Sequence, residues 1–320
     1  MIDLSQLSPM MQHYMETKKE YPDCILFYRL GDFYEMFFDD ALTVSKELEI
    51  TLTGKDCGLS ERAPMCGVPF HAVDSYLYRL VQKGYKVAIA EQMEDPKQAK
   101  GLVKREVIRV VTPGTITSSQ VLDETKNNYL MGIVYMDGIY GISTADISTG
   151  DFMVTEVDSE RELFDEINKF SPSEIICNNA LYMSGVDMDE LKNRYQVVIT
   201  ALDSRFFGEE SCRRILMEHF KVGALVGLGL EDYATGIIAA GAVMQYIYET
   251  QKSTLEHITT VTPYSTGQYM VIDTSTRRNL ELVETMREKQ KRGTLLWVLD
   301  KTKTAMGARL LRACIEQPLI

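Results

Sequence analysis

The stretch CILFYRLGDFYEMFF, residues 24–38, decides how the first part of the chain folds. Its first seven residues are mostly apolar or aromatic and predict a buried strand. Gly31-Asp32 predicts a sharp turn, and residues 34–48 predict a helix. Phe33 would then lie at a strand-to-helix corner, with the Glu35 carboxylate two residues on. Because aromatic side chains are usually buried, the residues alone favour Phe33 as a core residue; a ring aimed outward from the corner is the alternative.

The segments around this stretch predict a small domain with a mixed α/β sheet. Ser8 and Pro9 are typical of a helix start. Residues 54–69 are rich in Gly, Pro and charge, and they predict a long loop of the kind that often has a function. Helices are expected at residues 10–19 and 72–83, and strands at residues 49–53, 86–90 and 107–111.

Polar residues between positions 112 and 128 predict a domain boundary, which a second α/β domain follows. Three strands are expected there, at residues 129–135, 139–147 and 152–157. Asp137-Gly138 and Thr149-Gly150 suit the tight turns that would join these strands into an antiparallel meander. Ser159 and Glu162 have the spacing of a capping box for a helix, and further strands and helices follow. This order of elements predicts a ribonuclease-H-like α/β sheet.

Helical patterns dominate after about residue 260 and predict the start of an all-α part, with helices expected at residues 276–286, 295–299 and 305–316. Arg277-Arg278 lies near a helix start, where the helix dipole disfavours cations. The pair therefore indicates either an anionic partner or a buried ion pair. Residues 317–320 form an apolar end, which suggests that the natural chain continues beyond them.

The net charge of −12 argues against a nucleic-acid partner until its distribution is considered. Residues 1–112 carry −3, residues 113–264 carry −13 and residues 265–320 carry +4. The acid excess thus belongs to the middle of the chain. A local basic patch, or alternatively a solvated face, is formed by Lys97, Lys100, Lys104, Arg105 and Arg109.

Several classes of site and location can be weighed from residue types and spacing. The six cysteines and four histidines are scattered, without the spacing of a disulfide framework or a zinc site. No apolar run approaches membrane-spanning length and the N-terminus has no signal-peptide pattern, so a cytoplasmic protein is expected. No nucleophile with a nearby base stands out, and no phosphate-binding glycine loop does either.

A metal-dependent nuclease is the alternative from a different class, because ribonuclease-H-like folds often hold metal ions with carboxylates. The carboxylates available for such a site are those of Asp137, Asp146, Asp151 and Glu162. Their spacing matches no known ligand pattern, so the sequence itself gives this reading little support.

Six motifs carry a resemblance to a known family. In chain order they are Pro9-Met10-Met11-Gln12, Phe27-Tyr28-Arg29-Leu30-Gly31-Asp32-Phe33-Tyr34-Glu35, Gly67-Val68-Pro69-Phe70-His71-Ala72, Ile89-Ala90-Glu91-Gln92, Val110-Val111-Thr112-Pro113-Gly114-Thr115 and Thr276-Arg277-Arg278-Asn279-Leu280-Glu281. Together, and in this order, they resemble the N-terminal part of the MutS family of bacterial DNA mismatch-recognition proteins. Any one motif could arise by chance, whereas the ordered set is highly specific.

The resemblance implies a mismatch-binding domain at residues 1–112 and, after a linker at 113–127, a ribonuclease-H-like connector domain at 128–250. The start of a helical core or lever domain would follow at 260–320. The family's ATPase domain, which uses ATP and Mg, and most of its homodimer interface would lie beyond Ile320. The resemblance therefore implies that this chain is not itself an enzyme and needs no cofactor. It also implies that the partner protein MutL docks on the connector domain.

Phe33 and Glu35 match the Phe-x-Glu motif of the family. In the family the Phe wedges into the duplex from the minor groove at a mispaired base, and the Glu hydrogen-bonds that base. The resemblance thus implies that the chain binds mispaired or looped duplex DNA and kinks it. It implies further contacts with the DNA for Lys55, Met65, Phe70 and Arg105.

Overall fold

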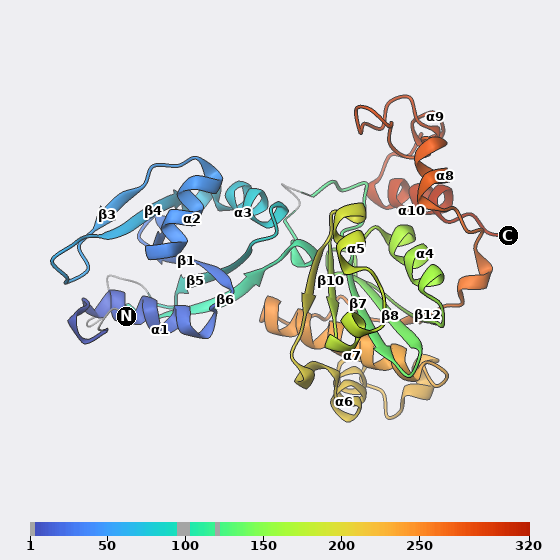
Figure 1. Cartoon of the computed structure of the whole chain (residues 1–320), viewed down its shortest axis with the longest axis horizontal. Coiled ribbons are helices and arrows are strands. Elements are labelled where there is room, and N and C mark those ends of the chain that lie inside the picture. The colour runs from blue at the N-terminus through green and yellow to red at the C-terminus, as the bar shows by residue number, and fades with distance from the viewer. Residues whose placement is uncertain (1–3, 95–102, 119–121) are drawn as a thin grey trace. The chain divides into compact units, whose positions relative to one another are not determined.

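The computed structural model describes residues 4–94, 103–118 and 122–320 (Figure 1). The chain divides into two compact units. Unit 1 comprises Met1–Val121 with Glu249–Ser253, and unit 2 comprises Leu122–Tyr248 with Thr254–Ile320. Across the described ranges, no helix combines the length and the apolar character that crossing a membrane requires.

Unit 1 is built on a mixed six-stranded sheet, as predicted. Its strands are β1 (Cys24–Leu30), β2 (Phe33–Phe37), β3 (Thr53–Lys55), β4 (Ala63–Pro69), β5 (Lys86–Gln92) and β6 (Arg105–Val111). They lie in the order β3-β4-β2-β1-β5-β6. The pairing of β1 with β5 is parallel, and the other pairings in this sheet are antiparallel.

Helices cover both faces of this sheet (Figure 1). The helical elements of unit 1 are α1 (Pro9–Glu20), α2 (Phe38–Leu48) and α3 (Val73–Gln82), with the short 3-10 turns η1 (Leu4–Gln6), η2 (Phe70–Ala72) and η3 (Pro113–Thr115). On the α1 face, Met11 and Tyr14 pack against Tyr28 and Phe37. Because side chains alternate along a strand, Phe33 and Glu35 belong to the same face of β2 as Phe37.

Three predictions for this part of the chain are wrong. Residues 34–48 do not form one helix: β2 runs to Phe37 and α2 begins at Phe38, which adopts φ +52° at the junction. The left-handed conformation turns the chain out of the strand and lets the helix start. The segment 54–69 is not a long loop either, because it contains most of β3 and all of β4, and the strand expected at 49–53 begins only at Thr53.

Unit 2 contains the second predicted α/β sheet. Its strands are β7 (Leu130–Met136), β8 (Ile139–Asp146), β9 (Asp151–Val157), β10 (Glu174–Cys177), β11 (Val198–Ala201) and β12 (Thr262–Pro263). They lie in the order β11-β10-β7-β8-β9-β12. The meander β7-β8-β9 is antiparallel, and β10, β11 and β12 add parallel strands at its edges. This is the ribonuclease-H-like arrangement that the sequence predicted.

The turn signals that predicted the meander act as expected at one of its two corners. Asp137 and Gly138 adopt φ +50° and +86° and join β7 to β8 as a tight hairpin. The second corner is wider: β8 and β9 remain paired up to Asp146 and Asp151, so residues 147–150 form the loop. Ser159 caps the next helix by accepting a hydrogen bond from the backbone nitrogen of Glu162, as its capping-box spacing predicted.

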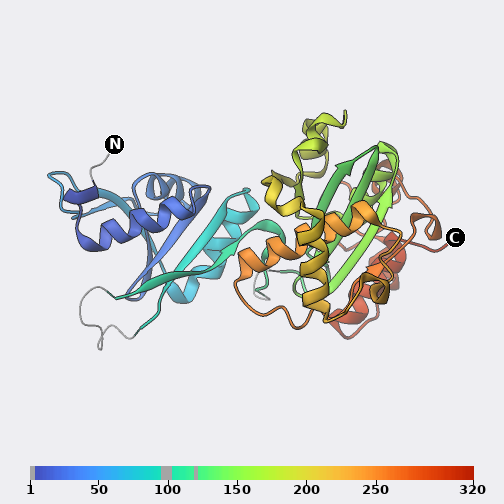
Figure 2. The same cartoon turned by 90° about the horizontal axis from the view of Figure 1, so that it is seen from below.

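Helices lie on both faces of the second sheet as well. The helical elements of unit 2 are α4 (Glu160–Phe170), α5 (Met188–Tyr195), α6 (Glu209–Phe220), α7 (Ala234–Gln251), α8 (Thr274–Asn279), α9 (Leu295–Leu299) and α10 (Ala305–Glu316), with 3-10 turns η4 (Asn179–Met183), η5 (Ser204–Phe207), η6 (Leu225–Leu228) and η7 (Thr266–Gln268). Figure 2 shows α6 and α7 in front of one face of the sheet. The opposite face packs on α4 and α5.

The helix α7 approaches the sheet closely because glycine lies beneath its first turn. A Cβ atom on Gly141 of β8 would lie 2.4 Å from both the carbonyl carbon and the carbonyl oxygen of Thr235. The Glu156 carboxylate of β9 accepts hydrogen bonds from the backbone nitrogens of Thr235 and Gly236, at 2.6 and 2.8 Å. These contacts fix the start of α7 on the meander.

The C-terminal helices follow the predicted order, but the first is shorter than expected. The helix predicted at residues 276–286 ends at Asn279, because Glu281 adopts φ +46° and leaves the helical conformation. Arg277 lies beside Glu316 of α10, with its Nη1 atom 3.7 Å from the carboxylate. Arg277 therefore forms an ion pair, one of the two predicted alternatives, and this pair is largely rather than fully buried.

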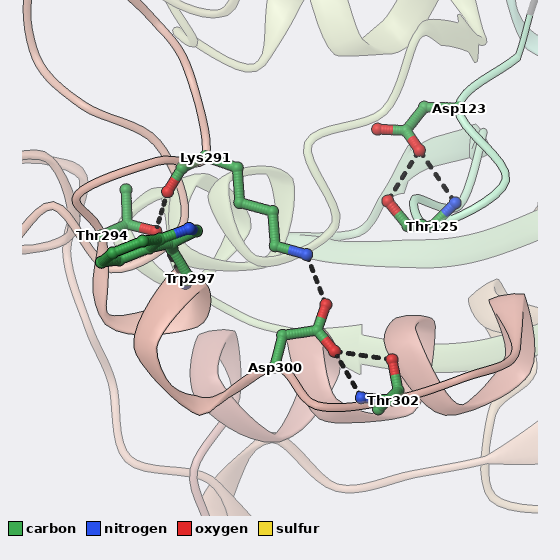
Figure 3. Close-up of polar contacts among 7 residues, drawn as sticks. All are labelled: Asp123, Thr125, Lys291, Thr294, Trp297, Asp300 and Thr302. Atoms are coloured by element: carbon green, nitrogen blue, oxygen red, sulfur yellow. Dashed lines mark hydrogen bonds and ion pairs between the residues drawn. The ribbon is translucent and has the colours of Figure 1, made fainter.

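Polar side chains order the loops around α9 and α10 (Figure 3). Thr294 accepts a hydrogen bond from the backbone nitrogen of Trp297 and so caps α9. The Asp300 carboxylate pairs with Lys291 and accepts two hydrogen bonds from Thr302, at 2.9 and 2.6 Å. These charge-assisted contacts hold the pKa of Asp300 well below its usual range.

Candidate nucleic-acid interface

Phe33 is displayed at the tip of the β1–β2 hairpin. Leu30 pairs with Phe33, so the turn consists of Gly31 and Asp32, and Gly31 adopts φ +58°. The Phe33 side chain is 46% exposed, whereas the flanking Tyr34 is buried on the opposite face of the strand. The interpretation of Phe33 as a core aromatic, which the residues alone favoured, is therefore wrong.

Glu35 lies beside Phe33 on the same face, over a glycine. In the pairing of β2 with β4, Gly67 stands opposite Glu35. A Cβ atom on Gly67 would lie 3.5 Å from Cγ of Glu35 and 3.8 Å from Cδ1 of Phe33. Gly67 was not singled out as a site residue from the sequence, although it belongs to one of the recognised motifs. Its missing side chain keeps the surface between the ring and the carboxylate open.

Lys55 pairs with Glu35. Its Nζ atom lies 2.5 Å from Oε2 of Glu35, and the two side chains are 31% and 17% exposed. The strand order explains the contact, because β3 lies next to β4 and β4 lies next to β2. The hairpin tip thus presents an apolar ring next to a carboxylate whose charge is balanced.

The other predicted contact residues differ in their surroundings. Met65 is partly buried on β4, opposite Phe37. Phe70 is exposed in η2, and the Arg29 guanidinium covers its ring, with Cζ 3.9 Å from the ring centroid. Arg105 is only 6% exposed. Its Nε atom donates to the carbonyl of Arg29 and its Nη1 atom to that of Val103, both at 2.7 Å.

The predicted basic patch is only partly described. Lys97 and Lys100 lie outside the described residues. Lys104 pairs with Glu106 at 2.5 Å, and this contact raises the pKa of Lys104 and lowers the pKa of Glu106. Arg109 lies 3.7 Å from Asp74. Lys104 and Arg109 therefore both have carboxylate partners.

Of the four carboxylates considered for a nuclease, Asp146 and Asp151 lie opposite each other on β8 and β9 and both accept hydrogen bonds from the Asn127 amide. Asp146 is fully buried, and its oxygens accept hydrogen bonds from Asn127, from the backbone of Asn128 and from Ser148. Its lone pairs are thus taken up by donors of the protein, as in a structural carboxylate. Within the described ranges, no three His, Cys, Asp or Glu residues are grouped so that they could hold a metal ion.

Comparison with known proteins identifies the family. The models of MutS domain I, MutS domain II and MutS domain III match residues 8–120, 128–259 and 275–320, in that order. The chain belongs to the MutS family. It holds domains I to III, and the ATPase domain of MutS is not among them. Phe33, Glu35 and Lys55 all lie within the part that matches MutS domain I.

Curated relatives agree with this assignment. The chain is 64% identical over 317 residues to the DNA mismatch repair protein MutS of Lachnoclostridium phytofermentans, a match that covers 99% of this chain and 34% of that protein. It is 54% identical over 320 residues to MutS of Acetivibrio thermocellus and 53% identical over 320 residues to MutS of Ruminiclostridium cellulolyticum, each covering 99% of this chain and 36% of the relative. The chain therefore spans about a third of the length of these relatives.

Proposed function

We propose that this chain recognises mispaired or looped duplex DNA, with Phe33 as a wedge and Glu35 as a hydrogen-bonding partner of the displaced base. The observation that carries the proposal is the 46% exposed Phe33 ring at a hairpin tip, directly beside a carboxylate. Burial of an aromatic ring is favourable by a few kcal/mol, so the exposed Phe33 ring would gain free energy from an apolar partner. Insertion of the ring between two bases of the DNA would supply that partner.

A wedge discriminates because its insertion has an energetic cost that depends on the DNA. Separating a stacked base step costs a few kcal/mol, and the cost is smaller where pairing is already defective. Bending is likewise easier at a weakly stacked step. Insertion of Phe33 would therefore favour binding to a mismatch over binding to a matched duplex, without hydrogen bonds that are specific for particular bases.

Glu35 would add a second criterion. A carboxylate near phosphates is repelled, and it gains energy only where a base offers a donor or where the carboxyl group is itself protonated. In the structure Lys55 already holds this carboxylate at 2.5 Å. A displaced base would replace Lys55 as the partner of Glu35, and Lys55 would then be free to bind a phosphate.

The remaining contacts are assigned by their surroundings. The exposed ring of Phe70 and the partly buried Met65 lie on strands or turns adjacent to β2 and would contact sugar or groove atoms. Arg105 would support the hairpin through the carbonyl of Arg29, because its guanidinium is buried. Domain II, which matches residues 128–259, would bind the partner protein MutL. The ATP-driven, dimeric action proposed for the full-length protein would depend on domains other than the three matched here.

The test is the preference for a G·T mismatch over the matched duplex, measured by fluorescence anisotropy in the full-length protein. Phe33→Ala should abolish the preference. Leu42→Ala is the matched control, because Leu42 is equally exposed, at 46%, but lies on α2 at the other face of the sheet. A Phe33→Ala protein that keeps its preference would refute the wedge.

A further inference from the structure

The turn that presents Phe33 is held from the face of the sheet opposite to Phe33. Arg29 of β1 pairs with Tyr34 of β2 in the strand register. Since side chains alternate, both belong to the face away from Phe33. Glu91 of β5 joins them there, because the hydroxyl group of Tyr34 donates to its Oε1 atom. The three residues form a polar cluster behind the hairpin tip.

Both carbonyl groups of the two-residue turn accept hydrogen bonds from outside the β1–β2 ladder. The Nε atom of Arg29 donates to the carbonyl of Gly31 at 2.6 Å. The backbone nitrogen of Phe70 donates to the carbonyl of Asp32 at 3.0 Å. A two-residue turn with both peptide oxygens held has little freedom to rock.

The guanidinium group of Arg29 is itself fixed on several sides. Its Cζ atom lies 3.9 Å from the Phe70 ring centroid, and its Nη1 atom lies 3.5 Å from Oε1 of Glu91. The backbone carbonyl of Arg29 accepts the hydrogen bond from Arg105. Only a planar, forked cation can stack on a ring and donate in two directions at once. Lysine at this position could keep the charge but not the geometry.

We propose that Arg29 is a positioning residue for Phe33: it clamps the Gly31-Asp32 turn and so holds the ring in one orientation before DNA arrives. A ring that is already ordered loses less conformational entropy on insertion, so the clamp increases the energy available for separating bases. For its effect on DNA this inference rests on the proposed wedge function. Its structural part, the ordering of Phe33, can be tested without DNA.

The first test measures the ordering of Phe33 directly. The 320-residue chain is labelled with 4-fluorophenylalanine at position 33 and examined by ¹⁹F NMR, as the parent sequence and as Arg29→Lys. The parent should give one narrow resonance, and Arg29→Lys a broadened or second resonance. Arg79→Lys is the matched control, because Arg79 donates to the carbonyl of Leu48 elsewhere in the same unit. An Arg29→Lys spectrum that superimposes on the parent spectrum would overturn the proposal.

The second test measures the consequence for DNA in the full-length protein. Arg29→Lys should lower the ratio of mismatch affinity to matched-duplex affinity about tenfold, while Arg79→Lys leaves the ratio unchanged. Equal losses in the two variants would mean a general loss of stability and would overturn the proposal. If Phe33→Ala abolishes the mismatch preference and Arg29→Lys does not change it, the wedge stands and the positioning role falls. If Phe33→Ala changes nothing, the wedge fails, and the ¹⁹F spectra still decide whether Arg29 orders the ring.

A second variant covers the case in which Arg29→Lys does not fold. Glu91→Gln keeps the size of the side chain and an acceptor for the Tyr34 hydroxyl group but removes the charge that faces Arg29. It should broaden the Phe33 resonance less than Arg29→Lys and lower the affinity ratio in the same direction. An unchanged spectrum for a folded Glu91→Gln protein, together with an unchanged ratio, would count against the clamp.

Discussion

The Nζ atom of Lys55 lies 2.5 Å from the Oε2 atom of Glu35, so the carboxylate beside the Phe33 ring already has a cationic partner within the protein. Because both side chains are partly buried, salt screens the attraction between them less than it would for an exposed ion pair. If Glu35 binds a displaced base as proposed, the hydrogen bond from that base would have to compete with the ammonium group of Lys55. A phosphate that draws Lys55 away would make this exchange easier. In the proposed complex, the ion pair would therefore couple the hydrogen bond from Glu35 to a base with the contact of Lys55 with the DNA backbone.

Replacing Glu35 by Ala is expected to raise the affinity for perfectly paired DNA. The change removes a negative charge near phosphates and frees Lys55 for them, and a fivefold fall in Kd would correspond to about 1 kcal/mol. The measurement is an anisotropy titration with matched duplex at two salt concentrations, where the gain should shrink as salt increases. Glu35→Gln separates charge from size and should show the same gain. Unchanged or weaker binding of the matched duplex by both variants would contradict the repulsion argument.

The close approach of α7 to the second sheet predicts a strong effect of a single methyl group. Gly141→Ala should lower the free energy of unfolding by about 1 to 3 kcal/mol, because the new Cβ atom would lie 2.4 Å from the Thr235 backbone. Gly223→Ala is the control, since its new Cβ atom would have no heavy atom of the described chain within 4 Å apart from its sequence neighbours, and its φ is not in the left-handed region. Urea unfolding followed by circular dichroism compares the two variants. Equal stabilities would show that the helix can shift away from the sheet at little cost.

Local signals were enough to predict much of the fold. The Asp137-Gly138 hairpin and the Ser159 cap followed from residues within a few positions of each other, and both are present. The strand β2 was missed although its turn was recognised, because Phe33–Phe37 is short and its aromatic residues fit a helix as well as a strand. The left-handed Phe38 that separates β2 from α2 has no signal of its own in the sequence.

The candidate site could likewise be predicted only in part from the sequence. The residues alone favoured Phe33 as a core aromatic, and Phe33 and Glu35 became site candidates only through the match of a short, contiguous motif to the MutS family. The side-chain contacts around these two residues could not be predicted from the sequence. Lys55 contacts Glu35 because the strands lie in the order β3-β4-β2, and Arg29 contacts Phe70 only once the strand register is set. Side-chain contacts across strands depend on register, which the pattern of residues alone did not determine.

Buried thiols predict a loss of stability at alkaline pH. Burial raises the pKa of Cys177 to about 12, and Cys177 is fully buried on β10. In the unfolded chain a thiol has a pKa near 8.5, so the folded state keeps a proton that the unfolded state loses. This contribution to stability is fully present below that pH and is lost as pH rises toward 12, at up to about 1.4 kcal/mol per pH unit.

Urea unfolding between pH 8.5 and 10.5 should therefore show a steeper decline in the free energy of unfolding for the parent chain than for Cys177→Ala. Cys314→Ala, which removes an exposed thiol, should leave the slope as it is. Parallel declines for the parent chain and Cys177→Ala would mean that the Cys177 thiol loses its proton as readily in the folded protein as in the unfolded one.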